Sequence, residues 1–448
     1  MRNKLLLLLA CCAMIASCSK DGGGNGSGKK YAGIKQLDVA DAKCLYSIAG
    51  GVIARSAESS ADGAKLFKIL ANTQTKEVAV VDENGEQIPV TDIYCEPLNE
   101  KLLFFGFGYR VEDKNDDAYS YTEYHAYLIH SENGTALEIP EALYQAFDWP
   151  PNDYKKEIHP SKNILSDKNN NLYCIVQSTI YKVTVGNSIT LNALTTDAKA
   201  ASDIYVDWLG TILYQNSAGG TTCITPAGQK YATGITIGDT GAIVPFPKSE
   251  VGGFLYIQKT NEDHGFYEYH INGSGQETST LLAVPDGVNV NIPQGDFAVA
   301  VNNKLTLFLD GPPQNYTDVK YMFIVSSPTT NNSASIKVIN DFLLWTNGRH
   351  AVGNQLCFLA EYGDYLGGNF NNTICTMDLD SETINTIYQI PNNRTCHGLV
   401  NTGDVVLFWL WDGPPDYEGY LCEIRNGVYS EKRTYGTVYF PVPFAMTR

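Results

Sequence analysis

The sequence predicts an all-β protein built as a single β-propeller, and three observations support this fold class. Short apolar runs recur along the chain, separated by Gly, Asn, Asp and Pro, with almost no sustained helical periodicity. Most of these runs are apolar on both faces, which suits strands covered on both sides better than the half-exposed strands of a two-sheet sandwich. The runs also recur at intervals of about 40 to 50 residues, the period of a propeller blade.

Each apolar run, here called an anchor run, is interpreted as one strand of a blade, and successive runs occupy the equivalent position in successive blades. A further strand precedes each anchor run, and two strands joined by a hairpin follow it, with turns such as Glu132-Asn133-Gly134 and Gly273-Ser274-Gly275. Four strands per unit is the composition of a propeller blade. The anchor runs are residues 102–107, 171–176, 211–216, 253–258, 304–309, 355–360 and 405–411.

The number of blades follows from the segment that precedes the first anchor run. Residues 43–51 and 64–90 supply the strands of one more unit, so that eight blades are preferred. If these N-terminal strands instead completed the sheet of the last blade and closed the ring, the count would be seven. In either case, residues 31–448 are expected to form one propeller domain.

The N-terminus reads as an export signal. Arg2 and Lys4 precede an apolar stretch at residues 5–15, which is too short to span a bilayer core of roughly 30 Å. The sequence that ends at Cys18 resembles a bacterial lipobox, in which the Cys is acylated and becomes the first mature residue. Residues 1–17 are therefore predicted to be a lipoprotein signal peptide. The alternative is an ordinary secretory signal that is cut near Ala16 or Ser17.

A flexible tether is predicted at residues 18–30, which are rich in Gly and Ser. Its opening, Ser19-Lys20-Asp21, is similar to the export signal of surface lipoproteins from anaerobic gut commensals. We therefore expect an outer-membrane lipoprotein, held to the membrane only by its lipid anchor. Display on the cell surface is the preferred orientation, and a periplasm-facing protein is the alternative.

The first predicted unit carries a family resemblance. Residues 66–89, LFKILANTQTKEVAVVDENGEQIP, together with the signal and the tether, resemble uncharacterised β-propeller lipoproteins of gut-commensal Gram-negative bacteria. The resemblance implies a cell-envelope location and a propeller fold. It supplies no catalytic residues.

Composition narrows the functional classes. The net charge of −17 disfavours nucleic acid and anionic membrane surfaces as partners. The chain has 11 Cys, and most of those that follow Cys18 lie in apolar runs. Because such positions are expected to be buried in strands, free buried thiols are favoured over disulfides. The seven His have no metal-ligand spacing, and no nucleophile motif occurs, so that no metal, cofactor or catalytic residue is assigned. A monomer is expected.

The predicted binding surface consists of the loops that follow the anchor runs. These loops converge on one face, and they combine Asp and Glu with exposed Tyr, which suits the hydroxyls and C–H faces of a neutral glycan. A repeated Asp-Gly-Pro-Pro motif after two anchor runs is interpreted first as a shared rigid turn. The predicted ligand-binding residues are Tyr121, Asp310, Tyr316, Tyr362, Asp364, Tyr365, Asp412, Asp416 and Tyr417.

The predicted function is therefore that of a lipid-anchored envelope protein that binds a glycan or an envelope protein through one propeller face. The alternative is a polysaccharide-degrading hydrolase or lyase, whose carboxylates or His would come from different blades. A purely structural scaffold is the third possibility, and it would bind no glycan at all.

Overall fold

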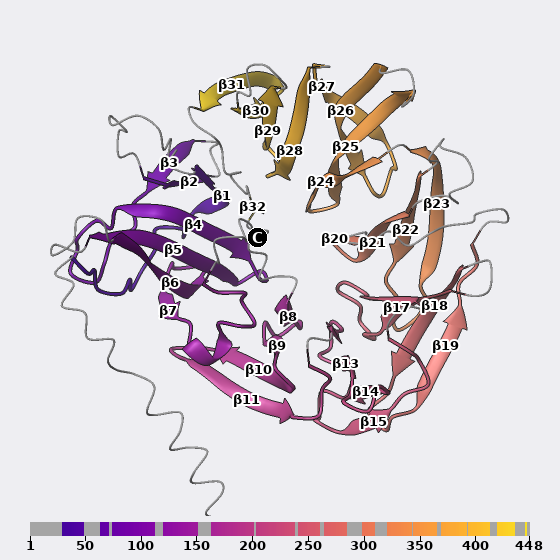
Figure 1. The fold of residues 1–448 in the computed structure, drawn as a ribbon. Coiled ribbons are helices and arrows are strands. Elements are labelled where there is room, and N and C mark those ends of the chain that lie inside the picture. The colour runs from indigo at the N-terminus through magenta and orange to yellow at the C-terminus, as the bar shows by residue number, and fades with distance from the viewer. Residues whose placement is uncertain are drawn as a thin grey trace, which may run out of the picture.

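The protein is a ring of eight four-stranded antiparallel sheets, seen along its axis in the computed structural model of Figure 1. The predicted all-β propeller with eight blades is confirmed. The helical residues among those described are a 3-10 turn, η1 (Glu141–Leu143), and Asn163. The structure describes residues 29–48, 63–70, 74–112, 120–150, 163–200, 203–237, 241–259, 264–284, 298–309, 320–342, 344–364, 369–391, 393–412, 419–434 and 444–445.

The first four blades comprise the N-terminal half of the ring and the C-terminal strand. Blade 1 consists of β1 (Ala42–Ile48), β2 (Lys65–Leu70), β3 (Thr75–Val78) and β32 (Phe444–Ala445). Blade 2 consists of β4 (Val90–Pro97), β5 (Leu102–Glu112), β6 (Ser120–His130) and β7 (Ala136–Glu138). Blade 3 consists of β8 (Leu165–Ser166), β9 (Leu172–Val176), β10 (Thr179–Val185) and β11 (Ile189–Thr195). Blade 4 consists of β12 (Ile204–Val206), β13 (Ile212–Gln215), β14 (Thr221–Ile224) and β15 (Lys230–Ala232).

The remaining four blades continue around the ring in sequence order. Blade 5 consists of β16 (Gly241–Pro245), β17 (Phe254–Lys259), β18 (His264–Ile271) and β19 (Glu277–Leu281). Blade 6 consists of β20 (Ala298–Val301), β21 (Lys304–Leu309), β22 (Lys320–Ser326) and β23 (Ser335–Phe342). Blade 7 consists of β24 (Leu344–Val352), β25 (Gln355–Asp364), β26 (Asn369–Asp378) and β27 (Ile384–Gln389). Blade 8 consists of β28 (Arg394–Asn401), β29 (Val405–Asp412), β30 (Gly419–Arg425) and β31 (Val428–Thr434).

The anchor runs are the second strands of blades 2 to 8, and their packing explains why both faces are apolar. In β29, Val406 and Phe408 join the hydrophobic cluster shared with blade 7, whereas Val405 and Leu407 join the cluster shared with blade 1. Successive side chains of a strand point to opposite faces, so each anchor strand contributes to two inter-blade cores. Burial on both sides is therefore a consequence of the ring.

The ring is closed by pairing between the two ends of the chain. β32 runs antiparallel to β1, with Leu45 opposite Phe444 and Cys44 opposite Ala445. The C-terminal strand thus completes the N-terminal blade and keeps the count at eight. The seven-blade alternative, in which N-terminal strands complete the last blade, is not what the structure shows.

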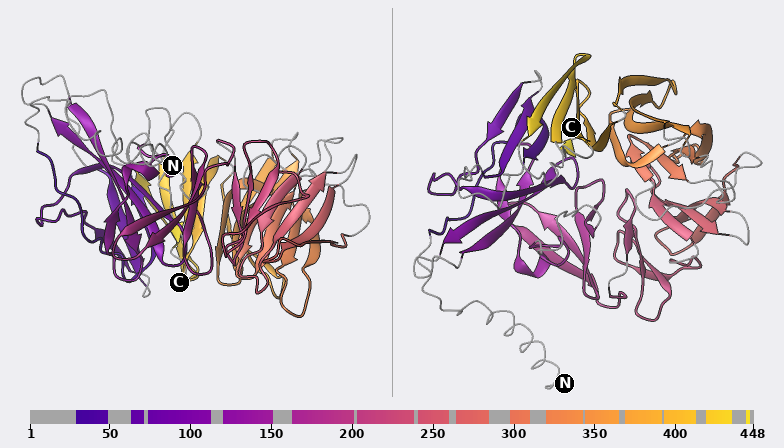
Figure 2. Two further views of the ribbon diagram at one scale, coloured as in Figure 1. Left: turned by 90° about the horizontal axis from the view of Figure 1, so that it is seen from below. Right: turned by 45° about the horizontal axis from the view of Figure 1, so that its top comes forward.

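The two faces of the ring differ in their connections (Figure 2). The hairpin face carries the links from each second strand to each third strand, and the turn face carries the first-to-second and third-to-fourth links. On the hairpin face, the paired strands of blade 2 reach Glu112 opposite Ser120, and those of blade 7 reach Asp364 opposite Asn369. Parts of the segments expected to be loops are therefore extensions of β-hairpins.

Residues 29–41, here called the seam segment, run along the junction of blades 1 and 2. Near the hairpin face, the ring of Tyr31 packs edge-on against Tyr109 with 5.1 Å between centroids. Near the turn face, the Leu37 amide donates to the Gly134 carbonyl over 2.8 Å. Leu37 and Val39 are almost completely buried. The seam segment is thus an integral part of the fold.

The eight described cysteines are free thiols and all are buried, as the sequence predicted. Burial raises the pKa of Cys174 and of Cys223 to about 12. Because the thiolate is the reactive form, these thiols are structural and chemically quiet. Among the described residues, no helix has the length and hydropathy needed to cross a bilayer.

Candidate functional site

Four of the nine predicted ligand-binding residues lie within the described part of the chain. Tyr121 and Asp412 lie at the hairpin face of blades 2 and 8. Tyr362 and Asp364 lie in the part of β25 that reaches the same face, where the backbone alone is described. Cys18 and the remaining predicted residues lie outside the described residues: Asp310, Tyr316, Tyr365, Asp416 and Tyr417.

Asp412 forms part of an ion-pair network at the end of blade 8. Its Oδ1 accepts a hydrogen bond from Nε of Arg394 over 2.8 Å, because these two residues are opposite each other in β28 and β29. Nη1 of Arg394 donates to Glu431 over 2.7 Å, and the guanidinium lies 4.3 Å above the centroid of the Tyr420 ring. Asp412 therefore holds Arg394 in place across the sheet.

The carboxylate of Glu431 is stabilised in its charged form within this network. Hydrogen bonds from Tyr429 and then from Arg394 lower the pKa of Glu431. Two carboxylates thus flank one guanidinium, whose side chain is 16% exposed. This arrangement forms a rigid polar rim beside the exposed end of β29.

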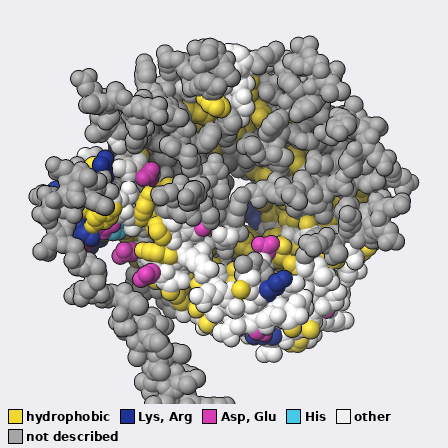
Figure 3. Space-filling view, viewed as in Figure 1, with side chains coloured by type: hydrophobic (Ala, Val, Ile, Leu, Met, Phe, Trp, Pro, Cys, Tyr) yellow, Lys and Arg dark blue, Asp and Glu magenta, His cyan; other side chains and the backbone are white. Residues whose placement is uncertain are grey.

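Two exposed aromatic side chains mark the hairpin face. Tyr121 is 47% exposed and Trp411 is 38% exposed, and they are the two aromatic residues in the exposed class among those the structure describes. They belong to blades 2 and 8, which flank blade 1. Figure 3 shows this face, with acidic side chains among hydrophobic and polar ones on its described part.

Trp411 was missed as a site residue because it ends an anchor run that is otherwise buried. Residues 405–410 are buried without interruption, and exposure begins at Trp411. The sequence of an apolar run does not show at which residue the neighbouring blades end and the side chains become exposed to solvent. The available signal was its position directly before the repeated Asp-Gly-Pro-Pro motif.

Tyr121 has a well-defined setting in blade 2. It lies opposite Val111 in the hairpin of β5 and β6. Two residues further along β6, Glu123 forms a 3.1 Å ion pair with Lys30 of the seam segment. The exposed ring therefore stands beside the place where the seam segment joins the propeller.

The turn face carries a cavity that sequence reasoning did not anticipate. Its volume is about 580 Å³, and it is lined by turns from blades 2 to 7 around the ring axis. Trp208 contributes a half-buried indole, and Lys248 of blade 5 forms a 3.1 Å ion pair with Glu100 of blade 2. Each blade supplies only a few residues, so no contiguous motif marks this cavity.

Within the described residues, no three His, Cys, Asp or Glu side chains come together closely enough to hold a metal ion. The described side chains at the two faces offer charged groups held in ion pairs, amides, hydroxyls and aromatic rings. Such groups bind and orient neutral or polar partners.

No protein-family model matches the chain, and no curated protein matches it. Solved structures do match it, at low sequence identity. A eukaryotic initiation factor is 12% identical, with 90% of this chain and 98% of that chain covered and a TM-score of 0.43. Dipeptidyl peptidase 4 of Porphyromonas gingivalis is 10% identical, with 78% and 55% covered and a TM-score of 0.42. The β-propeller domain of the Trilobed protease from Pyrococcus furiosus is 10% identical, with 77% and 96% covered and a TM-score of 0.37. Likeness at this level transfers no activity.

Proposed function

We propose that this protein is a lipid-anchored binding protein of the cell envelope that recognises a neutral glycan through its hairpin face. The observation that carries the proposal is the pair of exposed aromatic rings, Tyr121 and Trp411, on one face of blades that flank blade 1. Large aromatic rings contribute much contact area at little conformational cost, and they pack against the C–H faces of sugars.

Charge supports a neutral ligand. The chain carries −17, and the described rim of blade 8 carries the carboxylates of Asp412, which follows Trp411 in β29, and Glu431. Acidic side chains accept hydrogen bonds from sugar hydroxyls, whereas they repel polyanions such as pectin-like or sulfated polymers. A basic envelope protein is the alternative partner for the same face.

The aromatic pair is expected to contribute a large part of the affinity. The double substitution Tyr121→Ala with Trp411→Ala should weaken binding by about 30-fold, the effect of losing one interface hot spot of about 2 kcal/mol. The measurement is a neutral-glycan array, followed by calorimetry on any ligand found and by product analysis for cleavage.

Val428→Ala is the matched control, because this residue is 67% exposed and lies on the turn face of the same blade as Trp411. It should bind as the native protein does. Equal affinity in the double variant, with its circular dichroism unchanged, would contradict a site on the hairpin face. Release of shortened or unsaturated sugars would point to the hydrolase or lyase instead.

The lipid anchor has its own test. Cells that express the protein and are fed an alkyne fatty acid should label it, and Cys18→Ser should abolish the label and release the protein from the membrane fraction. Ser19→Ala, at the next position, should leave both unchanged. A Cys18→Ser protein that still labels would remove the anchor from the proposal.

A further inference from the structure

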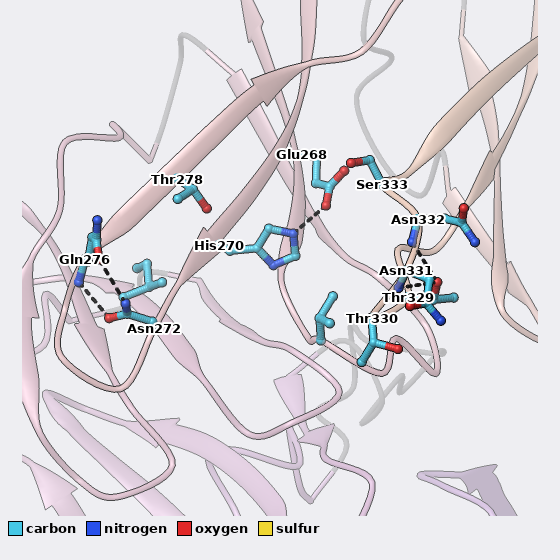
Figure 4. Close-up of a pocket in the computed structure, with 12 residues that line it drawn as sticks. Glu268, His270, Asn272, Gln276, Thr278, Thr329, Thr330, Asn331, Asn332 and Ser333 are labelled. Carbon is cyan, nitrogen blue, oxygen red and sulfur yellow. Dashed lines mark hydrogen bonds and ion pairs between the residues drawn. The ribbon is translucent and has the colours of Figure 1, made fainter.

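A second polar groove lies on the turn face, between blades 5 and 6 (Figure 4). Its volume is about 470 Å³. One wall is the hairpin turn between β18 and β19, and the other is the connection between β22 and β23. The side chains of the walls are mostly amides and hydroxyls, among them Asn272, Gln276, Thr278, Asn331, Asn332 and Ser333.

His270 lies between the two walls and is held there by a buried carboxylate. Its Nε2 lies 2.7 Å from Oε1 of Glu268, which is only 7% exposed. The other oxygen of Glu268 accepts a 2.7 Å hydrogen bond from the Ala334 amide of blade 6. This bond joins the two blades without the histidine, as do the hydrogen bonds from Ser249 to the Pro328 carbonyl and from Ser327 to the Pro247 carbonyl.

The backbone beneath His270 is shaped to admit the ring. Gly253 has a φ of +91°, and a Cβ at this position would lie 2.3 Å from Nδ1 of His270. Neighbouring Gly252 has a φ of +70°, and its Cβ would lie 2.4 Å from Oδ2 of Asp207. A glycine in a conformation that disfavours side chains thus lies where the imidazole needs space, and a second one lies where the Asp207 carboxylate does.

We propose that this groove is a second binding site, which takes a segment of a neutral glycan chain and has His270 as its central contact. The proposal goes beyond the function assigned to the hairpin face, because the two sites lie on opposite faces of the ring and use different residues.

The chemistry of the walls selects the ligand class. An amide side chain both donates and accepts hydrogen bonds, as does a hydroxyl, so the walls match the dual character of sugar hydroxyls. No Lys or Arg lines the groove, and both oxygens of Glu268 are already hydrogen-bonded. The carboxylate of the lining is therefore already partnered, the other lining groups are mostly amides and hydroxyls, and the volume of the groove suits a short oligosaccharide.

The test uses four neutral hexasaccharides, made of α-linked glucose, β-linked glucose, xylose or mannose. At least one should protect amides in residues 264–281 and 327–334 from hydrogen exchange. The double substitution Gln276→Ala with Asn331→Ala should weaken that binding at least tenfold. The turn itself is retained, because the backbone amide of Gln276 still donates to Oδ1 of Asn272 and only the 3.3 Å bond from Nδ2 of Asn272 to the Gln276 side chain is lost.

Gln229→Ala is the control, since Gln229 occupies the corresponding turn of blade 4 and its amide donates to Thr225 in the same way. It should leave binding unchanged. The proposal is overturned if none of the four sugars protects these segments, or if the double variant binds as the Gln229→Ala protein does. Protection confined to 120–124 and 405–412 would overturn the groove and leave the hairpin-face site standing.

Discussion

Replacing Asp207 by Ala should lower the free energy of unfolding by about 3 to 4 kcal/mol. Asp207 is 3% exposed, and its Oδ1 accepts from the amides of Leu209 and Thr211 over 3.0 and 2.7 Å. Its Oδ2 accepts from the Gly253 amide of blade 5 over 2.8 Å. Alanine leaves three amides without their acceptor, and each buried orphan costs about 1 to 3 kcal/mol.

Asp207→Asn is the control that separates hydrogen bonding from charge. Burial raises the pKa of Asp207, because desolvation outweighs the hydrogen bonds that favour its charged form. A raised pKa means that the carboxyl contributes stability below its unfolded pKa, and that this contribution is lost as the pH rises through the folded value. The neutral amide lacks this dependence and keeps one acceptor oxygen for Leu209 and Thr211, but its NH2 group would face the Gly253 amide. Asn should therefore cost about 1 to 3 kcal/mol at pH 7, less than Ala.

Urea unfolding of the three proteins at pH 7 measures these differences. A loss of less than about 1 kcal/mol for Ala would show that the amides find other acceptors, and would remove Asp207 as the link between blades 4 and 5.

Gly134→Ala should cost about 2 to 4 kcal/mol and detach the seam segment. Gly134 has a φ of +74°, and a Cβ there would lie 2.0 Å from the backbone oxygen of Leu37. Positive φ in a residue with a side chain costs about 1 to 2 kcal/mol, and a clash with backbone adds to it. The seam segment would have to move, which would expose Leu37 and Val39.

Gly228→Ala is the matched control, because Gly228 has a φ of +80° in the equivalent turn of blade 4 and nothing lies within 4 Å of its Cβ position. It should cost only the strain of about 1 to 2 kcal/mol. Thermal unfolding and proteolysis at residues 29–41 provide the readouts. Equal losses in both variants, with the seam segment still protected, would contradict the steric argument.

The architecture was predictable because ring packing leaves a local signature. Val406 and Phe408 face one neighbouring blade while Val405 and Leu407 face the other, and this is visible as an unbroken apolar run. The closure of the ring by Phe444 and Ala445 has no such signature in the sequence, because a strand of two paired residues is too short to show a periodic pattern.

The sites were less accessible to sequence reasoning, for a geometric reason. The contact between Asp412 and Arg394 follows from the register of β28 and β29, which the sequence does not reveal. Trp411 differs from the buried residues before it only because β29 extends beyond the neighbouring blades at this point. The cavity on the turn face draws Glu100 and Lys248 from blades that are not adjacent. Contacts between distant blades depend on the closed ring, which no stretch of sequence contains.

Under the proposed lipid anchor, the seam segment would also set the orientation of the molecule at a membrane. Its contacts run from Lys29 and Tyr31 at the hairpin-face rim to Leu37 near the turn face, so the chain enters the ring at that rim. With Cys18 acylated, as proposed, the 10 residues from Ser19 to Gly28 link the lipid-bearing residue to Lys29. They span at most about 40 Å when extended, and about 20 Å on average as a coil. Such an anchor would hold the hairpin face, with Tyr121 and Trp411, within that distance of the lipid, whereas the groove of His270 lies on the opposite face of the ring.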